Sequence, residues 1–368
     1  MKQKLALLLA LSLTTSDTFA ESIDLSAQFN TVYQQFQQAQ SEQNTELTIE
    51  LANQAFTLGK DLYGEQSINT ANLAINYALA LPYEQRDFYN NQSRALKYQL
   101  YIYAKNVYEK HYSPKDVNQI EVFIGLAKTT TSANESAHYF EEAIELSETQ
   151  PKLQADLHYQ AATHLFNHFS DKKYRIAKKH ASTADKMHRE LLPENTIERV
   201  KSNFLLASIA KGNNKKSEAI ERLNEIVTVF DSNLEFDHPY ELAAHSRLVE
   251  LYESTGKSDE ATKHCIAIAE MVPWKDNLDP SPLYRQEPRY PKTKIQQGKD
   301  GWVQMQFDIS ATGFVKNIVV LDSEGGSQFE EESIKALEKW RYAPKFENGR
   351  AVVAGPLTVQ LDFKIRKS

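Results

Sequence analysis

The spacing of apolar residues changes once along the chain, from a helical period to a period of two. From about Asp24 to Met271, small and aromatic residues recur at helical spacing, and the sparse prolines fall mostly where one helix should give way to the next. Beyond residue 288, apolar and polar residues alternate, as in half-buried antiparallel strands. The pattern predicts an all-α body followed by a small domain built on a sheet.

The best-defined helical segment is LVELYESTGKSDEATKHCIAIAEM, with Gly256 in a turn between two helices. It resembles a tetratricopeptide repeat, a helix-turn-helix unit of about 34 residues with Ala where the helices approach. The stretches ANESAHYFEEAIEL and NNKKSEAIERLNEIVTVF match less closely. One helix pair cannot bury its apolar face alone, so we expect stacked, tetratricopeptide-like repeats forming a solenoid over residues 21–272. Its concave surface suits protein partners; the alternative is a spacer or dimerisation body.

Residues 289–368 have the pattern of a β-β-α-β domain. Alternating apolar residues at 303–309 predict a strand, and a turn at Gly313 leads to a returning strand at 314–321. Residues 329–340 form an amphipathic helix that ends before Pro344, and residues 356–365 give the clearest strand of the chain. We therefore predict a small α+β domain, with a three-stranded antiparallel sheet and one helix on one face. A Pro-rich linker, residues 273–288, precedes it.

The first twenty residues read as a targeting segment. Lys2 and Lys4 precede an apolar run at 5–13, and Thr18-Phe19-Ala20 resembles a small-x-small cleavage site. The run is well short of the ~20 residues that span a bilayer. We predict a cleaved signal peptide over residues 1–20 and an exported protein; the alternative is an uncleaved N-terminal anchor.

Charge and candidate chemistry favour a binding protein over an enzyme. The net charge is −7, and residues 282–368 carry 14 Lys/Arg against 11 Asp/Glu, so the helical body is acidic and nucleic acid is not an expected partner. His164 and His168 share a helix face but lack the Glu of H-E-x-x-H and a third ligand, so we expect no metal site. No phosphate-binding loop or nucleophile motif is present, which predicts no catalytic residues, no cofactor and no small-molecule substrate. Cys265, the single cysteine, falls on the predicted buried side of a helix.

One set of short motifs in the last eighty or so residues carries a family resemblance. Together, in order and spacing, they are similar to the C-terminal domain of the TonB family: Tyr290-Pro291, Gly301, Gly313, the loop from Ser323 to Gly325, Trp340-Arg341-Tyr342-x-Pro344 and Asn348-Gly349. The resemblance implies a periplasmic domain that grips the TonB box of outer-membrane receptors by strand addition. It implies these partner-binding candidates: Tyr290, Pro291, Leu357, Val359, Leu361 and Phe363.

Two features of full TonB energy transducers are missing from the pattern, a membrane-spanning anchor and a long Pro-rich spacer. The leading hypothesis is therefore a non-enzymatic periplasmic adaptor, linked to TonB-dependent transport, that binds protein partners through both parts. One alternative is an energy transducer held in the inner membrane by an uncleaved N-terminal segment. Another is a structural envelope protein in which the C-terminal domain pairs with itself in a homodimer or contacts the cell wall.

Overall fold

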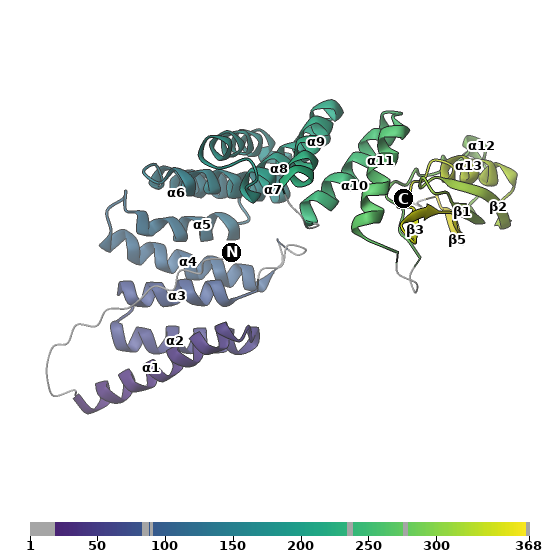
Figure 1. Cartoon of the computed structure of the whole chain (residues 1–368). Coiled ribbons are helices and arrows are strands. Elements are labelled where there is room, and N and C mark those ends of the chain that lie inside the picture. The colour runs from purple at the N-terminus through teal and green to yellow at the C-terminus, as the bar shows by residue number, and fades with distance from the viewer. Residues whose placement is uncertain (1–18, 83–87, 89–90, 234–237, 275–278, 366–368) are drawn as a thin grey trace. The chain divides into compact units, whose positions relative to one another are not determined.

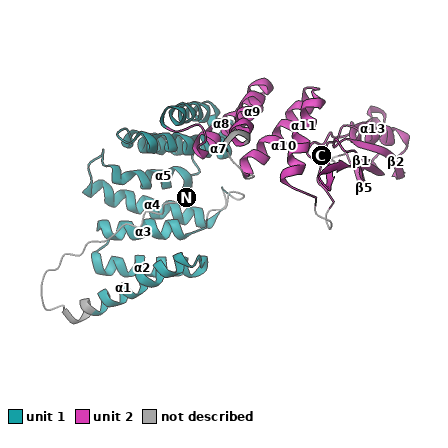
Figure 2. Cartoon of the chain, in the orientation of Figure 1, with its two compact units in different colours: residues 1–191 teal, residues 192–368 magenta. Residues whose placement is uncertain are grey.

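A computed structural model describes residues 19–82, 88, 91–233, 238–274 and 279–365 of the chain (Figure 1). The predicted signal peptide lies outside the described residues except for its last two positions. The chain divides into two compact units, residues 1–191 and residues 192–368 (Figure 2).

The first unit consists of helices, each packed against the next along the chain. Its longest helix leaves helical backbone angles at Phe169 and Lys173, so it acts as two helices joined by a kink. The elements are α1 (Phe19–Ser41), α2 (Thr45–Tyr63), α3 (Ile68–Ala80), α4 (Gln92–His111), a short 3-10 helix η1 (Val117–Gln119), α5 (Ile120–Thr129), α6 (Ala133–Leu146) and α7 (Pro151–Leu191).

Local sequence sets where several of these helices begin. The side chains of Asn44, Asn91 and Ser132 each accept a hydrogen bond from the backbone N–H three residues later, which caps α2, α4 and α6. Ser67 caps α3 through the N–H of Asn69. Such side chains satisfy N–H groups that have no partner inside the helix.

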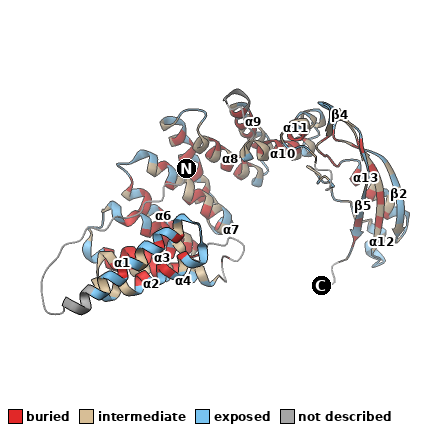
Figure 3. Cartoon of the chain, turned by 60° about the horizontal axis from the view of Figure 1, so that its bottom comes forward, coloured by how far each residue is buried: buried red, intermediate tan, exposed pale blue. Residues whose placement is uncertain are grey.

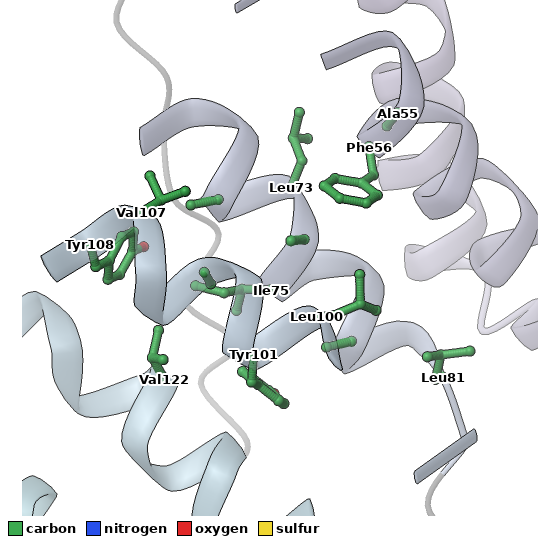
Figure 4. Packing of buried hydrophobic residues seen from close by; sticks show 14 of the residues in the cluster. Ala55, Phe56, Leu73, Ile75, Leu81, Leu100, Tyr101, Val107, Tyr108 and Val122 are labelled. Atoms are coloured by element: carbon green, nitrogen blue, oxygen red, sulfur yellow. The ribbon is translucent and has the colours of Figure 1, made fainter. Parts of the chain in front are cut away.

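Small residues let the helices of this unit approach closely. Ala71, Ala74 and Ala104 are fully buried and lie among the larger side chains of α2 to α5 shown in Figure 4. In the tyrosine-rich α4, Tyr101 and Tyr108 belong to this core. Helices such as α2 and α6 carry their buried residues at helical spacing, as predicted, whereas α3 and α5 are buried over most of their surface (Figure 3).

The second unit begins with two further helix pairs. The helices are α8 (Ile197–Gly212), α9 (Lys216–Asn233), α10 (Pro239–Ser254) and α11 (Ser258–Met271). Gly256 has a φ of 74° in the turn between α10 and α11, where a residue with a Cβ would be strained. Ala261, Cys265 and Ile268 are buried on α11, as the repeat pattern predicted. The mostly helical body with tetratricopeptide-like pairs is confirmed.

A small sheet domain completes the second unit. Its elements are α12 (Lys292–Gln296), β1 (Gly301–Ile309), β2 (Val315–Glu324), α13 (Ser327–Leu337), β3 (Lys345–Glu347), β4 (Arg350–Val352) and β5 (Ala354–Phe363). The main sheet is antiparallel in the order β2-β1-β5, and α13 packs over β1 and β2. The inward residues of β1 (Val303, Met305, Phe307 and Ile309) form the core with Phe329 and Leu337 of α13.

The predicted β-β-α-β order is confirmed, with local differences. Strand β2 continues to Glu324, so Ser323 and Glu324, expected in the loop, belong to the strand. The helix ends at Leu337 instead of Trp340. The Trp340 N–H donates to the carbonyl three residues earlier, as in a turn, and the extended segment before Pro344 begins there. The turn at Asn348-Gly349, where both residues have positive φ, joins the short hairpin β3–β4. Three-residue strands are too short to produce a readable alternation.

Candidate functional site

Strand β5 forms an edge of the main sheet. It pairs with β1 on one side, and no described strand pairs with its other side. From Leu357 to Phe363 its register against β1 is uninterrupted. An edge of this kind leaves main-chain N–H and C=O groups free to pair with another extended chain.

The hairpin geometry decides which residues of β5 point their main chain to the open side. The N–H of Ser310 donates to the C=O of Phe314 at 2.8 Å, so even-numbered positions of β1 face β2. The direction of the main-chain N–H and C=O groups alternates along a strand, so the odd-numbered residues of β1 direct these groups toward β5. Their partners in the register are odd-numbered residues of β5, such as Leu361 opposite Val303. The even-numbered residues of β5 therefore direct their N–H and C=O groups to the open side. These residues are Thr358, Gln360 and Asp362. Pro356, which lacks an N–H, falls on the same open side, where proline breaks no sheet bond.

The opposite edge of the sheet, β2, is irregular. Its register against β1 shifts twice, and Asn317 has a φ of 51°. The Asn317 side chain also donates to Asp308 Oδ2 at 2.8 Å, which pins the bulge to β1. Bulges and broken register hinder addition of a strand, so β5 is the better of the two edges.

The four predicted β5 residues lie on the helix-facing side of the strand. Leu361 and Phe363 are buried in the domain core, while Leu357 and Val359 are half-buried. Since α13 packs over β1 and β2, the row formed by Leu357 and Val359 borders the open edge. Apolar side chains of an added strand would pack against these two residues, and Leu361 and Phe363 would support them from the core.

The predicted pair Tyr290-Pro291 lies at the Phe363 end of β5. The Tyr290 ring packs edge-on against Phe363 and Phe329, with ring centroids 5.6 and 5.5 Å apart. Its hydroxyl donates to the Lys299 carbonyl at 2.7 Å. Pro291 begins α12. The structure thus brings Tyr290 onto the β5 row, where it helps to hold the end of the strand.

Sequence reasoning missed the residues that present the open edge. In the sequence, Thr358, Gln360 and Asp362 show only the polar side of an alternating strand. Their outward main chain depends on how β1 pairs with β2, and no local pattern encodes that pairing.

The histidines of the helical body do not assemble a metal site among the described residues, which contain no group of three potential ligands. His168 stacks on Phe88 with centroids 4.3 Å apart, and His164 contacts the same ring edge-on. Burial, together with the neighbouring His168 and Lys128, lowers the pKa of His164 to about 3. His164 is buried and His168 half-buried, and the His164 ring also contacts Phe140 of α6.

None of the described helices combines the length and the apolar character needed to cross a membrane.

The domain that carries this edge has known relatives. Residues 286–365 match the family described as Gram-negative bacterial TonB protein C-terminal. The chain carries a TonB C-terminal domain. Protein TonB of Pseudomonas aeruginosa is 35% identical over 92 residues, which are 25% of this chain and 27% of that protein. Protein TonB of Escherichia coli K12 is 34% identical over 65 residues, 18% of this chain and 27% of that protein.

Two solved structures are each similar to a different part of this chain. The solution structure of the Pseudomonas aeruginosa TonB C-terminal domain is 33% identical, with a TM-score of 0.22, and covers 25% of this chain and 93% of that chain. Kinesin light chain TPR-like repeats from Podosopora anserina are 14% identical, with a TM-score of 0.35, over 69% of this chain and 96% of that chain. The match to the curated TonB proteins spans about a quarter to a third of their length, so it concerns the TonB C-terminal domain.

Proposed function

We propose that this chain is a non-enzymatic periplasmic adaptor of TonB-dependent transport. Its TonB C-terminal domain binds an extended peptide, such as the TonB box of an outer-membrane receptor, as an added strand on β5. Its helical repeats hold a second protein partner. The observation that carries this proposal is the edge of β5 from Leu357 to Phe363, where the register against β1 is uninterrupted, in a domain that matches this family.

The edge offers two kinds of recognition. The main chains of Thr358, Gln360 and Asp362 supply hydrogen bonds that any extended peptide satisfies. Leu357 and Val359 supply an apolar row, so alternate residues of the peptide should be apolar and the residues between them polar.

A proline at Gln360 tests the edge directly. Gln360→Pro removes one outward N–H and leaves the odd-numbered residues that bond β1 in place. We expect it to weaken binding of a fluorescently labelled synthetic TonB-box peptide at least about tenfold, equivalent to ~1.4 kcal/mol, as measured by fluorescence anisotropy on the full chain.

Gln360→Ala is the matched control, because it removes the same side chain but keeps the N–H. It should bind the peptide as the parent chain does. Binding that is not saturable with the parent chain, or equal affinity in the proline variant, contradicts the proposed peptide site. Loss of self-association in Gln360→Pro, without any peptide binding by the parent, would favour the structural envelope alternative.

A further inference from the structure

Arg341, the middle residue of the Trp-Arg-Tyr motif, is fully buried in the second unit. Its neighbours Trp340 and Tyr342 point into the core of the TonB C-terminal domain. Because directions alternate in an extended segment, the Arg341 side chain points the opposite way, toward α10 and α11. An arginine is almost never fully buried without a charged or hydrogen-bonding partner.

The partners of the guanidinium come from the last helix pair of the repeats. Nη1 donates to Glu253 Oε1 of α10 at 2.5 Å, and Nη2 donates to Thr262 Oγ1 of α11 at 2.7 Å. Nη2 also donates to the Thr312 carbonyl of the β1–β2 turn at 3.0 Å, and the guanidinium lies 3.6 Å from the centre of the Phe314 ring. One side chain thus joins two repeat helices to the hairpin of the sheet domain.

Apolar and main-chain contacts extend this junction. Cys265, Val249 and Ile268 of the helix pair pack with Leu283, Tyr284 and Ala343. The main chain of Arg341 exchanges hydrogen bonds with Tyr284, and its carbonyl also accepts from the Leu283 N–H at 2.7 Å. The Trp274 indole donates to the Ala343 carbonyl at 3.0 Å. Residues of the predicted Pro-rich linker therefore contact the sheet domain.

We propose that the α10–α11 pair is a built-in partner of the TonB C-terminal domain, and that Arg341 is the anchor of this internal interface. The C-terminal domain is then held on the last repeat instead of swinging on a linker. A mechanical force applied to the β5 edge is then transmitted to α10 and α11 through the contacts of Arg341.

The single cysteine of the chain is a natural probe of the interface. Cys265 is fully buried, and the carbon that a side chain at Gly313 would add lies 3.6 Å from its Cβ, so the β1–β2 turn covers it. Arg341 Nη2 is 3.8 Å from its sulfur. A thiol reagent can reach Cys265 only when this interface opens.

The experiment measures the rate at which Ellman's reagent labels Cys265 in the folded full chain. We expect labelling at least about 100-fold slower than in the urea-unfolded chain. Glu253→Gln, which leaves the guanidinium without its counter-charge, and Arg341→Lys, which removes the forked geometry, should each raise the rate about tenfold or more. Circular dichroism at 222 nm should confirm that the helices remain folded.

Glu260→Gln is the matched control, since Glu260 lies on α11 but directs its hydrogen bonds and ion pair to exposed Lys263 and not to Arg341. It should label at the parental rate. If the parent chain labels as fast as the unfolded chain, or if Glu253→Gln labels at the parental rate, Arg341 does not anchor such an interface. Peptide binding at β5 is measured separately, so failure here leaves the proposed function standing.

Discussion

At the scale of single residues, Gly125 of α5 reverses the usual preference of a helix for alanine. Alanine is normally favoured over glycine inside a helix by about 1 kcal/mol. A Cβ at Gly125, however, would lie 2.3 Å from the Tyr101 ring, which is itself buried in the core. We expect Gly125→Ala to lower the free energy of unfolding by about 1–3 kcal/mol, because overpacking outweighs the gain in propensity. Urea denaturation followed by circular dichroism measures this.

Gly212, the last residue of α8, is the control for that change. A Cβ there would have no atom within 4 Å, so Gly212→Ala should leave the unfolding free energy unchanged or raise it slightly. Equal stabilisation by both substitutions would show that Tyr101 moves aside and that the α4–α5 contact is loose.

The residue pattern predicts which side chains are buried, but it does not predict which distant residue a buried polar side chain contacts. The spacing of Ala261, Cys265 and Ile268 was enough to place them in the core. The charge of Arg341, set between two core aromatics, was the only local sign that its side chain faces something else. Its partner Glu253 lies 88 residues earlier, and a single sequence holds no information on such a pairing.

At the scale of elements, two helix pairs are bridged by histidines. His158 and His180 of α7, and His245 and His264 of α10–α11, each approach with their Nδ1 atoms 2.8 Å apart. One ring must donate and the other accept, so the accepting ring carries no proton on its Nδ1 atom. In α8–α9, Asn203 makes the corresponding bridge, with its side chain donating to the Arg222 carbonyl.

These bridges predict loss of stability in mild acid. Burial, and then the charge of His245, lower the pKa of His264 to about 4, although Glu260 opposes the shift. The unfolded chain binds this proton near pH 6.5, while the folded chain does not until about pH 4. Stability is therefore fully present above pH 6.5 and is lost as the pH falls toward 4, by on the order of 1 kcal/mol per pH unit.

His264→Gln should reduce that dependence, because glutamine keeps a hydrogen bond and does not titrate. Urea midpoints at pH 7, 6 and 5 measure the slope. His138→Gln, at an exposed position of α6, serves as the control and should leave the slope unchanged. If His264→Gln shows the same dependence of the urea midpoint on pH as the parent chain, His264 already takes up its proton in the folded state.

The element order of the sheet domain could be read from the sequence because β1 and β5 alternate over seven or more residues and Gly313 marks the turn into β2. The hairpin β3–β4 could not, since only its turn leaves a signal. The choice between the two sheet edges also required the structure, because the bulges of β2 and the outward main chain of Gln360 depend on register.

At the scale of the whole molecule, the proposed adaptor and the alternative transducer differ at the N-terminus. The leading segment, with Lys2 and Lys4 before a short apolar run, predicts cleavage after Ala20. Helix α1 begins at Phe19, and its first buried aromatic is Phe29, so cleavage would remove two helical residues and no described core contact.

We therefore expect the protein in the periplasmic extract, with Glu21 as its first residue by N-terminal sequencing. An Ala20→Arg change should block processing, because a large charged side chain does not fit a small-residue cleavage site, and should leave the chain with the membrane fraction. Ala20→Ser, which keeps a small residue, should be processed normally. Recovery of the parent chain in the membrane fraction with residues before Glu21 intact would instead favour the anchored transducer, in which the edge of β5 is driven from the inner membrane.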